Sequence, residues 1–153
     1  MMRDIIFRGK ALADGKWWYG SYIHLDDTTW CCKNEYDAHP ENTHHFIVYD
    51  KMTDWNLPNE HRMIEVDGKT VGQDTGCVDK NGRHIFEGDI VRKRTHNGVK
   101  ELPVCFSEGC FHCGFGGGSS TPTHPYTLKD GQIEVVGNIY DGLEDEEQNA
   151  NTK

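Results

Sequence analysis

Apolar and polar residues alternate along this chain in short runs, which is the pattern of half-buried β-strands. No stretch of ten residues or more has the 3.6-residue apolar spacing of an amphipathic helix. The pattern therefore predicts a mainly β protein, with at most a short helical turn at Asp50–Trp55. The predicted strands are Ile5–Arg8, Trp17–Leu25, Phe46–Tyr49, Met63–Val66, Ile90–Arg94, Val99–Phe106 and Ile133–Ile139.

Pairs of Asp or Asn followed by Gly separate these strands. Such pairs favour tight hairpins, because a type I′ turn needs positive φ at both central residues. The five pairs are Asp14-Gly15, Asp67-Gly68, Asn81-Gly82, Asn97-Gly98 and Asp130-Gly131. They indicate antiparallel strands joined by short turns.

Changes of composition divide the chain into three predicted segments. Residues 1–68 form an N-terminal β region with irregular loops at 33–43 and 53–62, which are rich in Asn, Pro and charge. Residues 69–142 form a compact unit of short strands. Residues 143–153 are acidic and polar without apolar anchors, so we expect a disordered tail.

The charge balance limits the classes of partner. With 16 basic and 25 acidic residues, the 153-residue chain carries a net charge of −9, which disfavours broad binding to nucleic acid. No apolar run approaches the roughly 20 residues that span a bilayer, and no signal peptide is recognisable. We therefore expect no membrane association, a cytoplasmic location, and reduced thiols for the six cysteines.

The segment between Thr70 and Val91 is the most informative. Asp79-Lys80-Asn81-Gly82 favours a turn, Ile85-Phe86 supplies burial, and Glu87-Gly88-Asp89 turns the chain into the next strand. This segment resembles the signature of the YopX family. The blocks from Arg3 to Lys10 with Trp17 to Ser21, and from Glu134 to Tyr140, resemble the opening and closing of the same family, in the same order.

The resemblance implies a fold rather than an activity. It implies that residues 69–142 form an SH3-like barrel, and that the protein comes from a phage or prophage and resides in the cytoplasm of a bacterial host. The family has no established molecular activity. Asp74 and Cys77 depart from the family pattern, which has an aromatic and an aliphatic residue there.

Large aromatic residues fall on both faces of the predicted strand Trp17–Leu25. Both faces must therefore be covered, by the other part of the chain (with Phe46, Tyr49 and Trp55), by a second copy or by a bound partner. We expect a homo-oligomer. The candidate partner-binding residues are Trp17, Trp18, Tyr19 and Tyr22.

Basic residues flank the Asn97-Gly98 hairpin. They could bind nucleic-acid phosphates, or they could discourage edge-to-edge pairing of an exposed hairpin. We expect the second, given the net charge. The residues are Arg92, Lys93, Arg94 and Lys100.

A cysteine and histidine cluster lies between residues 105 and 113. A C-x-x-C pair suits Zn²⁺, but it lacks a matching second pair, so we expect these side chains to pack as small hydrophobes and to bind no metal. The cluster comprises Cys105, Cys110, His112 and Cys113.

No catalytic motif is recognisable, so we expect no enzyme and no cofactor. The sequence favours an accessory protein that binds a host or phage protein. The alternatives are sequestration of a small ligand or nucleotide as an anti-defence function, and nucleic-acid binding through the hairpin between Arg92 and Lys100.

Overall fold

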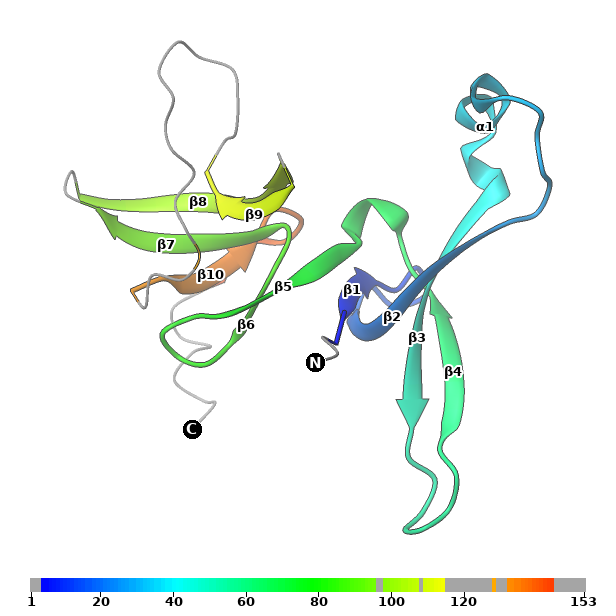
Figure 1. The fold of residues 1–153 in the computed structure, drawn as a ribbon, viewed down its shortest axis with the longest axis horizontal. Helices are drawn as coiled ribbons and strands as arrows, with labels where there is room; N and C mark the ends of the chain where they lie inside the picture. Colours follow the sequence, from blue (N-terminus) through cyan, green and yellow to red (C-terminus); the bar gives the residue numbers. More distant parts are fainter. Residues whose placement is uncertain (1–3, 96–97, 108, 115–127, 129–131, 145–153) are drawn as a thin grey trace. The chain divides into compact units, whose positions relative to one another are not determined.

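The computed structural model describes residues 4–95, 98–107, 109–114, 128 and 132–144 (Figure 1). The chain divides into two compact units, Met1–Gln73 and Asp74–Lys153. The boundary lies five residues later than the predicted one, within strand β5 (Gly72–Val78). The protein is mainly β, as the alternation of apolar and polar residues predicts.

The first unit is an antiparallel sheet with strand order β4-β3-β2-β1, to which the start of β5 is added beside β1. Its elements in chain order are β1 (Phe7–Lys10), β2 (Trp17–Asp26), α1 (Lys33–Ala38), the 3₁₀ turn η1 (Pro40–Asn42), β3 (Thr43–Lys51), β4 (Glu60–Glu65) and the 3₁₀ turn η2 (Gly68–Thr70).

Strand β3 belongs to two long hairpins of the first unit. Its first part pairs with β2 and its second part with β4. Figure 1 shows that the β2–β3 hairpin leads to α1, whereas the β3–β4 hairpin runs in the other direction to its own loop. Trp55, in that loop, is 86% exposed.

The first unit closes beside the end of β1. The chain leaving β4 returns to β1, where Ala11 bridges Val66 and the Asp67 N–H donates to the Lys10 carbonyl at 2.8 Å. Ile47, Val66 and Ala11 are buried there. Gly9 makes room for Val66, because a Cβ at position 9 would lie 2.9 Å from its side chain.

The second unit is an antiparallel sheet with strand order β11-β10-β7-β8-β9, preceded by the pairing of β5 with β6. Its strands are β6 (His84–Phe86), β7 (Asp89–Thr95), β8 (Gly98–Ser107), β9 (Cys110–Cys113), β10 (Glu134–Asn138) and β11 (Gly142–Leu143). Strand β8 changes partner, since its residues up to Pro103 pair with β7 and those from Val104 pair with β9.

The core of the second unit collects side chains from most of these strands. Aliphatic groups on neighbouring strands meet on one side of the sheet, where they are removed from water. The core residues are Ile85, Val91, Val104, Cys113, Leu128, Ile133 and Val135.

Asp79 fastens the turn between β5 and β6 to β10. Its buried carboxylate accepts the backbone N–H groups of Asn81 at 2.8 Å, Arg83 at 2.9 Å and, from β10, Val135 at 3.1 Å. The Lys80 N–H donates to the Ile133 carbonyl at 2.9 Å. The turn Asp79–Gly82, which we call the signature turn, is therefore attached to β10 and to the residue before it.

All seven predicted strands are present, with shifted ends. Strands β5, β6, β9 and β11 were not predicted. Strands β6, β9 and β11 have only two to four residues, too few to show a clear alternation. Strand β5 contains Gly and Asp, which are uncommon in strands.

The predicted helical turn at Asp50–Trp55 is wrong. Asp50 and Lys51 end β3, and the chain then turns through Asn56, whose φ is 63°. The α-helix of the described residues, α1, lies instead in the stretch 33–43 that was expected to be irregular.

The Asx-Gly pairs behave differently from one another. Gly15 and Gly82 have positive φ in tight turns, as predicted. Asp67-Gly68 does not form a hairpin, because the Asp67 carboxylate accepts the Lys69 N–H and starts η2. Gly98 follows β7 with φ of 109°. Asn97 and the pair Asp130-Gly131 lie outside the described residues.

The described strand pairs leave β9 and β11 as the edges of the second sheet, so they form no closed barrel. Leu143 and Glu144 were assigned to the tail, but Leu143 lies in β11 and the Glu144 carboxylate binds Arg83 through two contacts of 2.7 and 2.8 Å. Residues 145–153 lie outside the described part. No described helix has the length and apolarity to cross a membrane.

We predict that Gly20→Ala destabilises the first unit by about 2 kcal/mol or more, because over-packing strains a close contact. A Cβ at this position would lie 2.1 Å from the Val48 carbonyl oxygen. All four tryptophans lie in the first unit, so urea unfolding followed by tryptophan fluorescence measures this change. The control Ser21→Ala, on the same strand and exposed, should change stability by less than about 0.5 kcal/mol. Equal effects of both variants would contradict the prediction.

We predict that Asp79→Ala destabilises the second unit by about 2 kcal/mol or more, because three N–H groups, of which that of Val135 is buried, lose a charged acceptor. Hydrogen exchange of the β10 amides measures the loss of protection. Asn81→Ala, an exposed change in the same turn, serves as the control. Retained protection of Val135 in the Asp79 variant would refute the role of this carboxylate.

Candidate functional site

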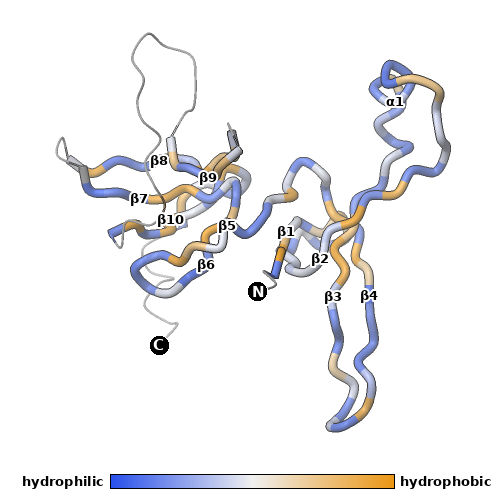
Figure 2. Tube along the Cα trace, viewed as in Figure 1, coloured by the Kyte–Doolittle hydropathy of each residue, from blue (hydrophilic) through white to orange (hydrophobic). Residues whose placement is uncertain are grey.

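An apolar patch covers one face of the sheet of the first unit, across β2, β3 and β4. Register places Ile23 opposite Phe46, and Ser21 opposite Val48, which in turn lies opposite Met63. Residues opposite or two apart share a face. Figure 2 shows the hydrophobic stretches of the three strands. We call the patch the interaction face; it comprises Ile23, Leu25, Phe46, Val48 and Met63.

The interaction face is open to solvent in the structure. Leu25 and Met63 are each 51% exposed, and Ile23, Phe46 and Val48 are half-buried. Isolated exposed apolar side chains are common on proteins, but a contiguous patch indicates a binding surface. The patch therefore differs from the scattered exposed leucines and methionines of the loops.

Ion pairs border the interaction face. The His44 ring lies between two carboxylates, with Nδ1 2.6 Å from Glu65 and Nε2 3.1 Å from Asp27. These hydrogen bonds, first to Glu65 and then to Asp27, raise the pKa of His44. At the other end, His61 Nδ1 lies 2.6 Å from the Asp50 carboxylate.

Two of the predicted partner-binding aromatics lie on the same side of the sheet as the interaction face. The Arg8 guanidinium lies over the Trp17 ring at 4.7 Å from its centre, so Trp17 is half-buried. Tyr19 is 50% exposed and lies opposite Arg8 on β1. Of the two, Tyr19 offers the larger accessible surface.

The other two predicted aromatics, Trp18 and Tyr22, lie on the opposite side of the sheet. The Trp18 ring contacts Tyr49 with centres 4.6 Å apart. The Tyr22 hydroxyl lies 2.7 Å from His45 Nδ1, and burial raises the pKa of Tyr22. Trp18 and Tyr22 thus have contacts within their own chain and do not need a second copy to cover them.

Of the residues expected to help cover β2 from within the chain, Tyr49 does so, whereas Phe46 and Trp55 do not. Phe46 belongs to the interaction face and Trp55 projects from the β3–β4 loop. Phe46, Val48 and Met63 were therefore not predicted as surface residues. Phe46 and Val48 alternate with buried Ile47, and Met63 precedes Ile64, so the sequence did indicate that these three residues lie on the other face of their strands.

The four basic residues of the β7–β8 hairpin divide between two faces. Arg92 pairs with Glu101, and Arg94 lies opposite Val99. Lys93 and Lys100 lie opposite each other on the other face, where Lys93 is only 7% exposed. The four cations therefore do not form one continuous basic surface.

The cysteine and histidine cluster is also divided. Cys105 Sγ lies 3.5 Å from His112 Nδ1 across the β8–β9 pair, and Ser107 Oγ bonds His112 Nε2. Cys110 lies on the same face, opposite Ser107. Cys113 points the other way and is fully buried in the core.

Within the described residues, no three His, Cys, Asp or Glu side chains are grouped so as to hold a metal ion. The division of the cluster follows from strand geometry. Residues three apart on a strand, such as Cys110 and Cys113, face opposite sides of the sheet.

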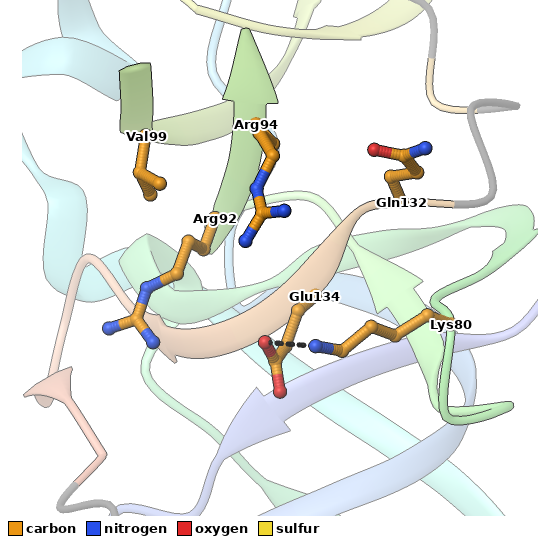
Figure 3. Close-up of a pocket in the computed structure, with 6 residues that line it drawn as sticks. All are labelled: Lys80, Arg92, Arg94, Val99, Gln132 and Glu134. Atoms are coloured by element: carbon orange, nitrogen blue, oxygen red, sulfur yellow. Dashed lines mark ion pairs between the residues drawn. The ribbon is translucent and has the colours of Figure 1, made fainter.

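A cavity of about 300 Å³ lies on the second unit, where the β7–β8 hairpin faces β10 and the signature turn (Figure 3). The cavity could not be predicted from the sequence, because its residues come from four separate segments. They are Lys80, Arg92, Arg94, Val99, Gln132 and Glu134.

The fold and these surfaces define a class of two-unit, mainly antiparallel β proteins with one apolar sheet face and one charged cavity. The chain belongs to the YopX family, whose model, described as YopX protein, matches residues 6–144. The predicted family is thus confirmed.

The chain is also similar to a solved structure. The crystal structure of protein EF1440 from Enterococcus faecalis matches it with 21% sequence identity and a TM-score of 0.46. The match covers 90% of this chain and 94% of that one. No curated protein matches the chain at a significant level.

We predict that His44 makes the first unit less stable as the pH rises. A raised pKa in the folded state means that the protonated ring is stabilised by folding, fully below its unfolded value of about 6.5. That contribution is lost as the pH rises through the folded pKa. Urea unfolding followed by tryptophan fluorescence between about pH 6 and about pH 8 should show the decline.

His44→Gln should flatten this decline, whereas His24→Gln, at an exposed position on the opposite face of β2, should retain it. An unchanged pH dependence in the His44 variant would show that the contacts with Glu65 and Asp27 do not couple its protonation to folding.

Proposed function

We propose that this chain is a phage or prophage accessory protein that acts by binding a protein, of the host or of the phage, in the cytoplasm of the bacterial host. The observation that carries the proposal is the interaction face. Membership of the YopX family supports the phage or prophage origin. The proposal includes no catalytic function and no cofactor.

The composition of the interaction face suits a protein partner. Its centre is aliphatic and aromatic, and charged pairs formed by His44 with Glu65 and by His61 with Asp50 surround it. Protein interfaces have this arrangement of an apolar centre and a polar rim. Exposed Tyr19 extends the surface along β2.

A second copy of the chain is the partner that we propose first. Strand β2 carries bulky groups on both sides, and Tyr49 and His45 contact those on one side only. A stable interface buries at least about 1,000 Å² in total, so we expect it to include Tyr19 and the β3–β4 hairpin as well as the interaction face. Trp17 and Tyr19 would contribute to it, whereas Trp18 and Tyr22 would support it from behind.

The proposal also covers the fold of the second unit and the role of the Cys105–His112 pair. We take the second unit to be an SH3-like barrel, which is supported by the exchange of partners along β8 and by a core drawn from β6 to β10. We take the Cys105–His112 pair to be structural, because its second ring nitrogen bonds Ser107 rather than an orienting carboxylate.

We predict that the purified protein has a mass at least twice the 17.5 kDa of one chain in light scattering at micromolar concentration. Leu25→Glu should dissociate it, because it replaces an exposed apolar side chain of the interaction face with a carboxylate that the second copy would have to remove from water. His24→Glu is the matched control, one residue away on the opposite face, and should leave the mass unchanged. Circular dichroism and tryptophan fluorescence verify that both variants are folded.

A wild-type mass near that of one chain would refute self-association. Affinity capture from phage-infected cells, with wild type against Leu25→Glu, would then test a different protein partner. Equal capture by both forms would refute the interaction face as the binding surface.

A further inference from the structure

The cavity of the second unit has the size of a small-molecule site. Its volume of about 300 Å³ is at the lower end of the roughly 300–1,000 Å³ that such sites have, and suits a ligand of mononucleotide size. Its residues come from β7, β8, β10 and the signature turn, all within one unit.

The charges of this cavity are unequal. Lys80 Nζ lies 2.7 Å from the Glu134 carboxylate, and Arg92 lies 3.0 Å from Glu101, outside the cavity lining. Arg94 forms no ion pair with any described residue. Of the three cations that line the cavity, Lys80 and Arg92 thus have a carboxylate partner among the described residues, and Arg94 has none.

The side chains are arranged around a common space. Figure 3 shows the Arg94 guanidinium pointing toward the middle of the cavity, between Arg92 on one side and the Lys80–Glu134 pair on the other. Val99 supplies an apolar wall and Gln132 an amide that can donate and accept. The arrangement combines an anion site, hydrogen-bonding groups and an apolar surface.

We propose that this cavity binds a small phosphate ester, a 5′-mononucleotide, with its phosphate on Arg94. Guanidinium groups bind phosphate through two parallel hydrogen bonds. Arg92 adds positive charge, Glu134 and Gln132 accept from the hydroxyl or amino groups of the ligand, and Val99 contacts the base. The site is independent of the interaction face, whose residues belong to the first unit.

A single phosphate fits the charges better than a nucleic-acid strand does. A strand needs a surface that neutralises several successive phosphates, whereas Lys93 and Lys100 lie on the other face of the hairpin and the whole chain carries a net charge of −9. Among the described residues, the cavity has one cation without an ion pair, Arg94. It therefore suits one terminal phosphate group.

Isothermal titration calorimetry of the full chain with 5′-AMP, 5′-GMP, 5′-CMP and 5′-UMP tests this proposal. At least one should bind, and its nucleoside without phosphate should bind about tenfold more weakly or not at all, since charge-assisted hydrogen bonds are lost. Arg94→Gln should lower the mononucleotide affinity about tenfold. Arg62→Gln, which removes an exposed arginine from the first unit, is the matched control and should leave it unchanged.

Inorganic phosphate with a second variant separates binding from folding. Glu134→Gln removes a negative charge and releases Lys80, so it should raise phosphate affinity, whereas Arg94→Gln should lower it. Opposite changes cannot both come from unfolding. The proposal is overturned if no mononucleotide binds, if Arg94→Gln binds as wild type does, or if a ten-nucleotide single-stranded RNA binds and mononucleotides do not.

Discussion

The carboxylate of Asp79 is the contact on which the second unit depends. It accepts two N–H groups of its own turn and a third from Val135 on β10, so one buried side chain joins segments that are far apart in the sequence. Loss of this acceptor would leave the Val135 N–H, which is buried, without its hydrogen bond. The turn that Asp79 fixes also places Lys80 against Glu134, which makes one wall of the cavity.

The first unit is built differently, and this difference explains its open surface. Its small interior forms where the chain after β4 returns to β1, around Ile47 and Val66. Side chains on the inner side of the sheet are covered there, but the long hairpins extend beyond this closure. Within the described residues of the first unit, no second layer covers the apolar outer side of β2, β3 and β4, although an apolar sheet face is normally packed against another layer.

Alternation and turn chemistry were sufficient to predict the β class and seven strands, because both act over a few neighbouring residues. Sites that depend on pairing were not predictable in this way. The spacing of Cys110 and Cys113 suggested a metal knuckle, but in a strand these residues face opposite sides and Cys113 enters the core. Phe46 and Met63 meet only through the register of β3 with β2 and β4, and the cavity joins four segments.

The walls of the cavity differ in how tightly they are tied to the fold. Lys80 lies in the turn that Asp79 attaches to β10, and Glu134 lies in β10 itself. Arg94 and Val99 are exposed residues of the β7–β8 hairpin. Substitutions at exposed positions of this kind usually change stability by less than about 0.5 kcal/mol. The chemistry of this side of the cavity can therefore diversify during evolution while the scaffold that presents it stays intact.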